Sequence, residues 1–395
     1  MNRILITTIL IPLIALLTAS CGKNSSNEPE TPKTHRTVMV YMVADNSLGN
    51  SWKSDQADLA EMETAARNGD LNGGRLLVYH NRPGTANGNA PQLLEITATG
   101  TTVLKTYPDD PSLYSVTISR MREAITDMKK FAPAADYGLV LWSHANGWLE
   151  NTSTDIDEDA VRKRAFGEDR TRTMKLTSLG RALEDEHFSF IYFDCCLMGT
   201  VEVAYQLRNS ADVIVASPTE LHIDGMPYDK NVAAFFTKGT PDMVKAATNT
   251  FEHYDNRTNG VQRMCQMVVV NTSSLSQLAS ASKAIYATLT DYPSSTGVQK
   301  YVRASSKCYI YDMAQHTRLM AASRPDLLTA WQQAFDKTVI YAATTPTAIG
   351  SVTIDTENYG GLGEFIVQTP TDITYRGYDN CAWWADVVSA APIYQ

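Results

Sequence analysis

Five short apolar runs recur along the first half of this chain, and they constrain its fold more than any other feature. They lie at 37–43, 75–80, 137–142, 188–193 and 211–217. Continuous apolar runs of this length are typical of parallel strands that are buried on both faces. Segments with helical spacing fall between them, at 54–67, 118–130, 176–183 and 198–207. This order predicts an α/β fold with a mostly parallel sheet and helices on both faces.

The second half is less regular. Helices are expected at 241–253, 275–289 and 327–342, and strands at 266–270 and 307–313. No linker or change of composition separates this half from the first. We therefore expect a catalytic domain over 37–240 and a C-terminal subdomain over 241–395 that packs on the same sheet.

The N-terminus has the pattern of an export signal over residues 1–20, followed by a polar tether over 21–36. Arg3 precedes an apolar run that is too short to span a membrane easily, and small residues precede Cys21. A cysteine at that place resembles a bacterial lipoprotein signal, although Thr18 stands where leucine is usual. We expect lipidation of Cys21 and anchoring to the bacterial cell envelope, in the periplasm or on the cell surface. Plain secretion is the alternative.

Charge and cysteine content exclude several classes of protein. The formal net charge is −9 and no basic block occurs, so nucleic acid is a poor partner. Six cysteines are present, and lipidation of Cys21 would leave five, so at least one thiol would stay free. No cysteine pair has zinc-ligand spacing, and no phosphate-binding loop or dinucleotide fingerprint is present.

Two reactive residue types follow two of the apolar runs. His144 comes just after the run at 137–142, and Cys196 just after the run at 188–193. Because parallel strand ends share one rim of a sheet, these side chains can meet there. A lone cysteine is more often a small buried residue, and a lone histidine a satisfied polar group. Their joint placement favours a thiol peptidase, with Cys196 as nucleophile and His144 in proton transfer.

Three segments carry a resemblance to a known family. They are the segment 41–48, the segment 142–148 around His144, and the segment 194–199 around Cys196. Together they resemble the clostripain family of cysteine peptidases. The resemblance implies a caspase-like three-layer α/β sandwich, related to gingipains and legumain, and cleavage after Arg or Lys.

The resemblance also implies site roles. Asp194 matches the carboxylate of the pocket that receives the basic side chain, and a strand-end cap is the alternative. Asp224 is a candidate second carboxylate, or else a turn residue before Gly225. The backbone N–H groups of Ala145 and Cys196 would hold the oxyanion. A helix directly after Cys196 would lower the pKa of its thiol.

Two positions depart from the family pattern. Ala145 replaces a glycine, so it keeps the N–H group but loses conformational freedom, which puts the oxyanion site in doubt. Cys195 replaces an alanine, either as a small buried residue or as a competing thiol. These departures leave an alternative function, a surface lipoprotein of the same fold that binds peptide or glycan without cleaving it.

The segment 151–172 has no apolar period and predicts a surface loop. Its basic cluster suits activation by self-cleavage, which the resemblance implies, with the bond after Arg164 preferred and Lys163 and Arg162 as the other candidates. A solvated charged loop is the alternative. Acidic residues at 155–159 lack the glycine and the terminal glutamate of a calcium loop. Calcium therefore has no motif to support it, no other cofactor is expected, and we expect a monomer acting on protein or peptide substrates.

Overall fold

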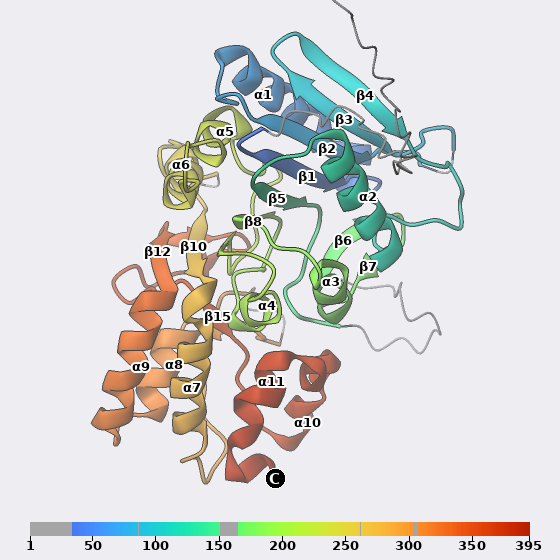
Figure 1. Cartoon of the computed structure of the whole chain (residues 1–395). Helices are drawn as coiled ribbons and strands as arrows, with labels where there is room; N and C mark the ends of the chain where they lie inside the picture. Colours follow the sequence, from blue (N-terminus) through green and yellow to red (C-terminus); the bar gives the residue numbers. More distant parts are fainter. Residues whose placement is uncertain (1–33, 86, 151–164, 261, 303–306) are drawn as a thin grey trace, which may run out of the picture. The chain divides into compact units, whose positions relative to one another are not determined.

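A nine-stranded sheet forms the centre of the computed structural model, which describes residues 34–85, 87–150, 165–260, 262–302 and 307–395. The strand order is β12-β10-β9-β8-β5-β1-β2-β3-β4 (Figure 1). The strands are β1 (Thr37–Val43), β2 (Arg75–Asn81), β3 (Gln92–Thr97), β4 (Gly100–Thr106), β5 (Tyr137–Trp142), β8 (Phe190–Asp194), β9 (Val213–Ala216), β10 (Gln266–Asn271) and β12 (Val339–Thr344). The five central strands, from β9 to β2, run parallel, and two antiparallel strands extend each edge.

Helices cover both faces of this sheet and make a three-layer structure. One face packs against α1 (Ser54–Asn68), α5 (Tyr228–Phe235) and α6 (Met243–Asp255). The other face packs against α2 (Ile118–Phe131), α3 (Leu176–Leu183) and α4 (Val201–Gln206). The same core cluster continues into the C-terminal helices α7 (Leu275–Tyr286), α8 (Met313–Met320), α9 (Pro325–Thr338), α10 (Pro370–Ile373) and α11 (Ala382–Asp386).

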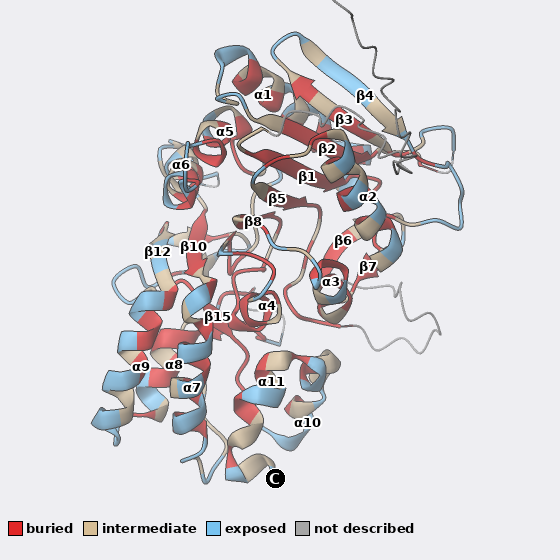
Figure 2. Cartoon of the chain, viewed as in Figure 1, coloured by how far each residue is buried: buried red, intermediate tan, exposed pale blue. Residues whose placement is uncertain are grey.

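Burial on both faces explains the continuous apolar runs. All seven residues of β1 are buried (Figure 2). Met39 and Tyr41 face the core on the α2 side, whereas Val38 and Val40 face the core on the α1 side. Because successive side chains of a strand point to opposite faces, both sets must be apolar. The predicted fold class, an α/β sandwich with a mostly parallel sheet, is confirmed.

Two local predictions in the second half are wrong. Residues 339–342 were expected to extend a helix, but α9 ends at Thr338 and the chain continues as β12. Val339, Ile340 and Tyr341 are β-branched or aromatic, and pairing with β10 gives their backbone groups partners at the sheet edge. The strand expected over 307–313 is reduced to β11 (Tyr311–Asp312), which pairs with β15 (Gly363–Glu364).

The N-terminal segment enters the fold at Thr34, which pairs with Ala134. Arg36 is buried and donates hydrogen bonds to Asp136 at 2.6 Å and to the carbonyl of Phe235 at 2.8 Å. Cys21 and the expected signal lie outside the described residues. Within the described part of the chain, no helix is long and apolar enough to cross a membrane.

Candidate active site

Cys196 and His144 lie beyond the ends of neighbouring parallel strands. Trp142, the last residue of β5, is in register with Asp194, the last residue of β8. His144 and Cys196 therefore each follow this register pair by two residues. Both line one cavity of about 640 Å³, together with Asp194 and Ala145. The topology thus places His144 and Cys196 on one rim of the sheet and at one cavity.

Cys196 is half-buried, and its surroundings are made by the segment after β9. The backbone N–H of Leu221 points at its Sγ, 3.4 Å away. Leu197, the next residue, has a φ of +66°, a conformation that costs energy in a non-glycine residue. Its N–H donates to the carbonyl of Thr219 at 2.9 Å, which holds the strained turn in place. Cys196 thus lies on a sharp turn that the segment after β9 supports.

The helix that follows Cys196 begins later than expected. The sequence predicted helix from residue 198, but α4 begins at Val201, with Thr200 as its N-cap. The segment between Cys196 and Val201 instead contacts the C-terminal half: Gly363 donates its N–H to the carbonyl of Gly199 at 2.9 Å. A helix terminus acts only over about its first turn. The first residue of the helix expected beside Cys196 thus lies five residues further along the chain, at Val201.

The adjacent Cys195 is fully buried in the core. Its thiol lies 3.6 Å from the carbonyl of Leu141, and burial raises its pKa well above the usual value. A buried thiol with a raised pKa is a poor nucleophile, because the thiolate is the reactive form. Of the two interpretations of Cys195, the geometry favours the small buried residue.

Ser47 is a contact of His144 that sequence reasoning missed. Its Oγ lies 2.8 Å from Nε2 of the imidazole. Ser47 follows β1 in a turn built by Asn46, whose side-chain amide donates to the carbonyls of Val43 and Glu168 at 2.8 Å and 2.7 Å. A polar turn at the end of β1 was visible in the sequence, but its partners were not.

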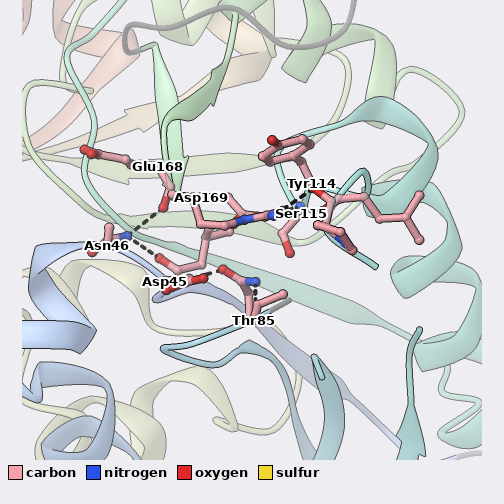
Figure 3. A network of polar contacts seen from close by, with 12 residues as sticks. Asp45, Asn46, Thr85, Tyr114, Ser115, Glu168 and Asp169 are labelled. Carbon is pink, nitrogen blue, oxygen red and sulfur yellow. Dashed lines mark hydrogen bonds and ion pairs between the residues drawn. The ribbon is translucent and has the colours of Figure 1, made fainter. Parts of the chain in front are cut away.

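A hairpin of β6 (Phe166–Asp169) and β7 (Arg172–Met174) supports the same region. The carbonyl of His144 accepts a hydrogen bond from Gly167 N–H at 2.9 Å, and Ser143 Oγ accepts from Glu168 N–H at 3.0 Å. Figure 3 shows Asn46 reaching Glu168, and Asp169 accepting from the N–H of Ser115 at 2.6 Å. The prediction of a surface loop over 151–172 is wrong for its last part, because Phe166 and Asp169 are fully buried. The predicted cleavage residues Arg162, Lys163 and Arg164, like the acidic stretch at 155–159, lie outside the described residues.

Ala145 accommodates the bend of the His144 segment without strain. It is not among the described residues with positive φ, and the residue that does need this conformation is Gly147, with φ +67°. A side chain at Gly147 would also meet the carbonyl oxygen of Leu197 at 2.9 Å. Ala145 therefore needs no conformation reserved for glycine, whereas Gly147, two residues later, does.

Asp194 forms part of the cavity wall and is almost completely buried. Its Oδ1 accepts a hydrogen bond from Met226 N–H at 3.0 Å, and the side chain of Tyr228 adjoins the carboxyl group and favours its charged form. Burial raises its pKa to about 7, and the nearby Glu61 acts in the same direction. Gly225 passes so close that a Cβ there would lie 3.0 Å from the carboxylate. The result is a desolvated carboxyl group that faces the cavity without a countercharge.

A second buried carboxyl group, which the sequence did not reveal, lies next to this wall. Asp58 of α1 accepts a hydrogen bond from the indole N–H of Trp142 at 2.6 Å. Burial and the nearby Asp194 raise its pKa well above the usual value. Asp224, in contrast, is largely exposed and pairs with Arg257 at 3.0 Å and His222 at 3.2 Å. The structure thus brings Asp194 to the cavity but turns Asp224 toward a basic partner.

The described residues hold no group of three or more His, Cys, Asp or Glu side chains arranged to bind a metal ion. What they do bring together is a thiol, an imidazole and backbone N–H groups in one cavity beside a buried carboxylate. This arrangement defines a thiol hydrolase of the α/β sandwich class. Comparison with known proteins then gives the family.

The family model of the clostripain family, Peptidase_C11, matches residues 40–375. The chain therefore belongs to the clostripain family and is a cysteine peptidase, as the sequence motifs suggested. A search of the curated proteins found none that matches.

Two solved structures are similar over almost their whole length. One is an inactive zymogen C11 protease from Parabacteroides distasonis, 28% identical, with 90% of this chain and 99% of that chain covered and a TM-score of 0.74. The other is a secreted C11 cysteine protease from Bacteroides thetaiotaomicron in complex with an irreversible peptide inhibitor. It is 26% identical, with 89% of this chain and 98% of that chain covered and a TM-score of 0.75.

Proposed function

We propose that this peptidase cleaves peptide bonds after Arg or Lys. The observation that carries the proposal is Asp194, a buried carboxyl group on the cavity wall, two residues before Cys196. A guanidinium or ammonium group would supply the countercharge that Asp194 lacks, in a site where the desolvated carboxylate interacts strongly with it. Because Asp224 already pairs with Arg257, the proposal assigns recognition of the basic side chain to Asp194.

The catalytic step follows from the same geometry. Cys196 gives its thiol proton to His144, and its Sγ attacks the carbonyl carbon of the scissile bond. The N–H groups of Cys196 and Ala145 donate to the developing oxyanion. No residue in the described part of the chain accepts a hydrogen bond from the N–H of Ala145, so this donor is available. His144 gives a proton to the leaving amine, with Ser47 at hydrogen-bond distance from its ring. Water then releases the acyl group from Cys196.

Self-cleavage in the segment 151–172 is the activation step that we propose. A similar protein is described as an inactive zymogen, which fits an enzyme whose activity is controlled after synthesis. Ala165, the first described residue after the basic cluster, is fully buried, and its carbonyl accepts from Asn146 N–H at 3.1 Å. Mapping the new N-terminus by mass spectrometry would distinguish cleavage after Arg164 from cleavage after Lys163 or Arg162.

We further propose that the protein is exported and is anchored through a lipid on Cys21. The motif before Cys21 supports this proposal, and a similar enzyme is described as secreted. Metabolic labelling with a fatty-acid analogue would test it. Incorporation that disappears in a Cys21→Ser variant is the expected result, and an unlabelled, freely secreted chain would contradict the anchor.

Fluorogenic peptides that end in Arg, Lys, Leu or Asp test the specificity. Processed wild-type protein should hydrolyse the Arg and Lys peptides, and Cys196→Ala protein should hydrolyse none. Hydrolysis of casein without hydrolysis of the Arg or Lys peptides would remove the specificity proposal. Incubation of both proteins alone tests self-cleavage, because only the wild type should split into two chains.

A further inference from the structure

The segment that carries His144 is held in place by residues from two distant parts of the chain. On one side are Ala165, whose carbonyl accepts from Asn146 N–H, and Gly167 of β6, whose N–H donates to the carbonyl of His144. On the other side is Tyr309, which lies in the C-terminal half just before β11. Its hydroxyl group donates a hydrogen bond to the side-chain carbonyl of Asn146. Asn146 is the residue directly after Ala145 and lines the catalytic cavity.

Tyr309 is built into this position by packing. Only 8% of the residue is exposed, and its ring meets the buried Trp148 edge to face, with 6.3 Å between ring centroids. The next residue, Ile310, lies beside Gly147. The carbonyl of Ile310 accepts from Tyr301 N–H at 3.0 Å, which fixes the backbone on the other side. The C-terminal half thus touches the His144 segment at two successive residues, Tyr309 and Ile310.

The charge environment keeps the phenol of Tyr309 in its donating form. Burial raises its pKa above the usual value, and Glu220 and Cys196 act in the same direction. A neutral phenol can donate to a carbonyl oxygen, whereas a phenolate could not.

We propose that Tyr309 is a positioning residue that holds Asn146 and thereby aims the Ala145 N–H at the oxyanion. The inference rests on the proposed catalytic role of Ala145. A donor must lie about 3 Å from the oxyanion to act, and small misplacements of catalytic groups reduce rates strongly. The C-terminal half therefore completes the active site and is more than a support for the sheet.

The test compares Tyr309→Phe with a matched control, Tyr301→Phe, in the full processed protein. Tyr301 is also buried, and its hydroxyl donates to Asp312 at 2.5 Å, so the control also removes one buried hydroxyl bond. For Tyr309→Phe we expect kcat to fall about tenfold with KM within twofold, since loss of a direct oxyanion donor costs about 100-fold or more. For Tyr301→Phe we expect an unchanged kcat and a lower thermal unfolding midpoint.

Alkylation of Cys196 by iodoacetamide separates an effect on the oxyanion donor from an effect on the reactivity of the thiol. This reaction forms a carbon–sulfur bond and releases iodide, without an oxyanion, so its rate should stay within twofold in Tyr309→Phe. An unchanged kcat in Tyr309→Phe would overturn the inference, and an equal loss of alkylation would show that Tyr309 acts on the thiol or His144 instead. The measurements use casein beside an Arg peptide, so a failure of the Arg or Lys specificity is seen separately from a failure of the Tyr309 role.

Discussion

Replacement of Asp194 by asparagine should make the protein more stable at neutral pH and less able to bind a basic side chain. Asparagine keeps the size of the side chain and an oxygen that can accept from Met226 N–H, but it carries no charge. The wild-type carboxyl group has a pKa of about 7, raised from 3.8 by burial. Between these values the folded state holds a proton that the unfolded state has lost. Wild-type stability therefore falls as the pH rises from about 4 to about 7, and then levels off.

The size of the effect follows from this shift. About three pKa units correspond to about 4 kcal/mol, at about 1.4 kcal/mol per unit. The asparagine amide replaces a carboxyl oxygen beside Tyr228 by an N–H group, and this exchange costs about 1 kcal/mol. At pH 4.5 the unfolded carboxyl group is already mostly ionised, so the wild type has lost about 1 kcal/mol by then. We therefore expect Asp194→Asn to be about as stable as the wild type near pH 4.5 and more stable by about 3 kcal/mol at pH 8.

Urea unfolding at pH 4.5 and pH 8 measures both values, with Asp224→Asn as a control at an exposed carboxyl group. The same residue must be ionised to bind a cation, so wild-type kcat/KM for an Arg peptide should rise as the pH passes through about 7. Asp194→Asn should lose most of this activity at every pH. An equal change in unfolding free energy at the two pH values would refute the reasoning, because no ionisation would then be linked to folding.

Three further substitutions test the remaining parts of the site. Cys195→Ala should keep peptidase activity within a few-fold, whereas Cys196→Ala should abolish it. Loss of activity in Cys195→Ala with a normal unfolding curve would show that Cys195 is the nucleophile. Gly147→Ala should reduce kcat at least tenfold and cost about 1–3 kcal/mol of stability, because of its φ of +67° and the nearby Leu197 carbonyl. Unchanged activity and stability would show that the site does not require the close contact between Gly147 and Leu197. Ala145→Gly should leave kcat within about threefold, and a large increase would mean that alanine does misalign the oxyanion site.

Much of the fold could be predicted because strands buried on both faces leave a continuous apolar pattern. The positions of His144, Asp194 and Cys196 followed from the ends of those strands, since parallel neighbours end at one rim. The hairpin after residue 165 was missed because its polar residues find buried partners only in the folded chain. Asp169, for example, is predicted from sequence to be a surface residue, but in the fold it is buried and accepts a hydrogen bond from the N–H of Ser115.

Contacts between distant segments were beyond the reach of local patterns. Ser47 and Tyr309 each reach the His144 segment from far along the chain, and nothing in their neighbouring residues marks this role. Asp224 was a reasonable candidate by its place after a strand, but its ion pair with Arg257 depends on the packing of α6. Residue type and spacing thus located the reactive groups, whereas their orientation depends on tertiary structure.

The most direct test of the central claim is covalent labelling by an arginyl chloromethyl ketone, compared with a norleucyl analogue of equal length. The reagent alkylates the nucleophile only after its basic side chain has been bound. We predict a single adduct on Cys196 of the processed protein, formed much faster with the arginyl reagent than with the norleucyl one. Labelling of Cys195, or equal rates with the two reagents, would contradict the account of nucleophile and pocket given for this enzyme.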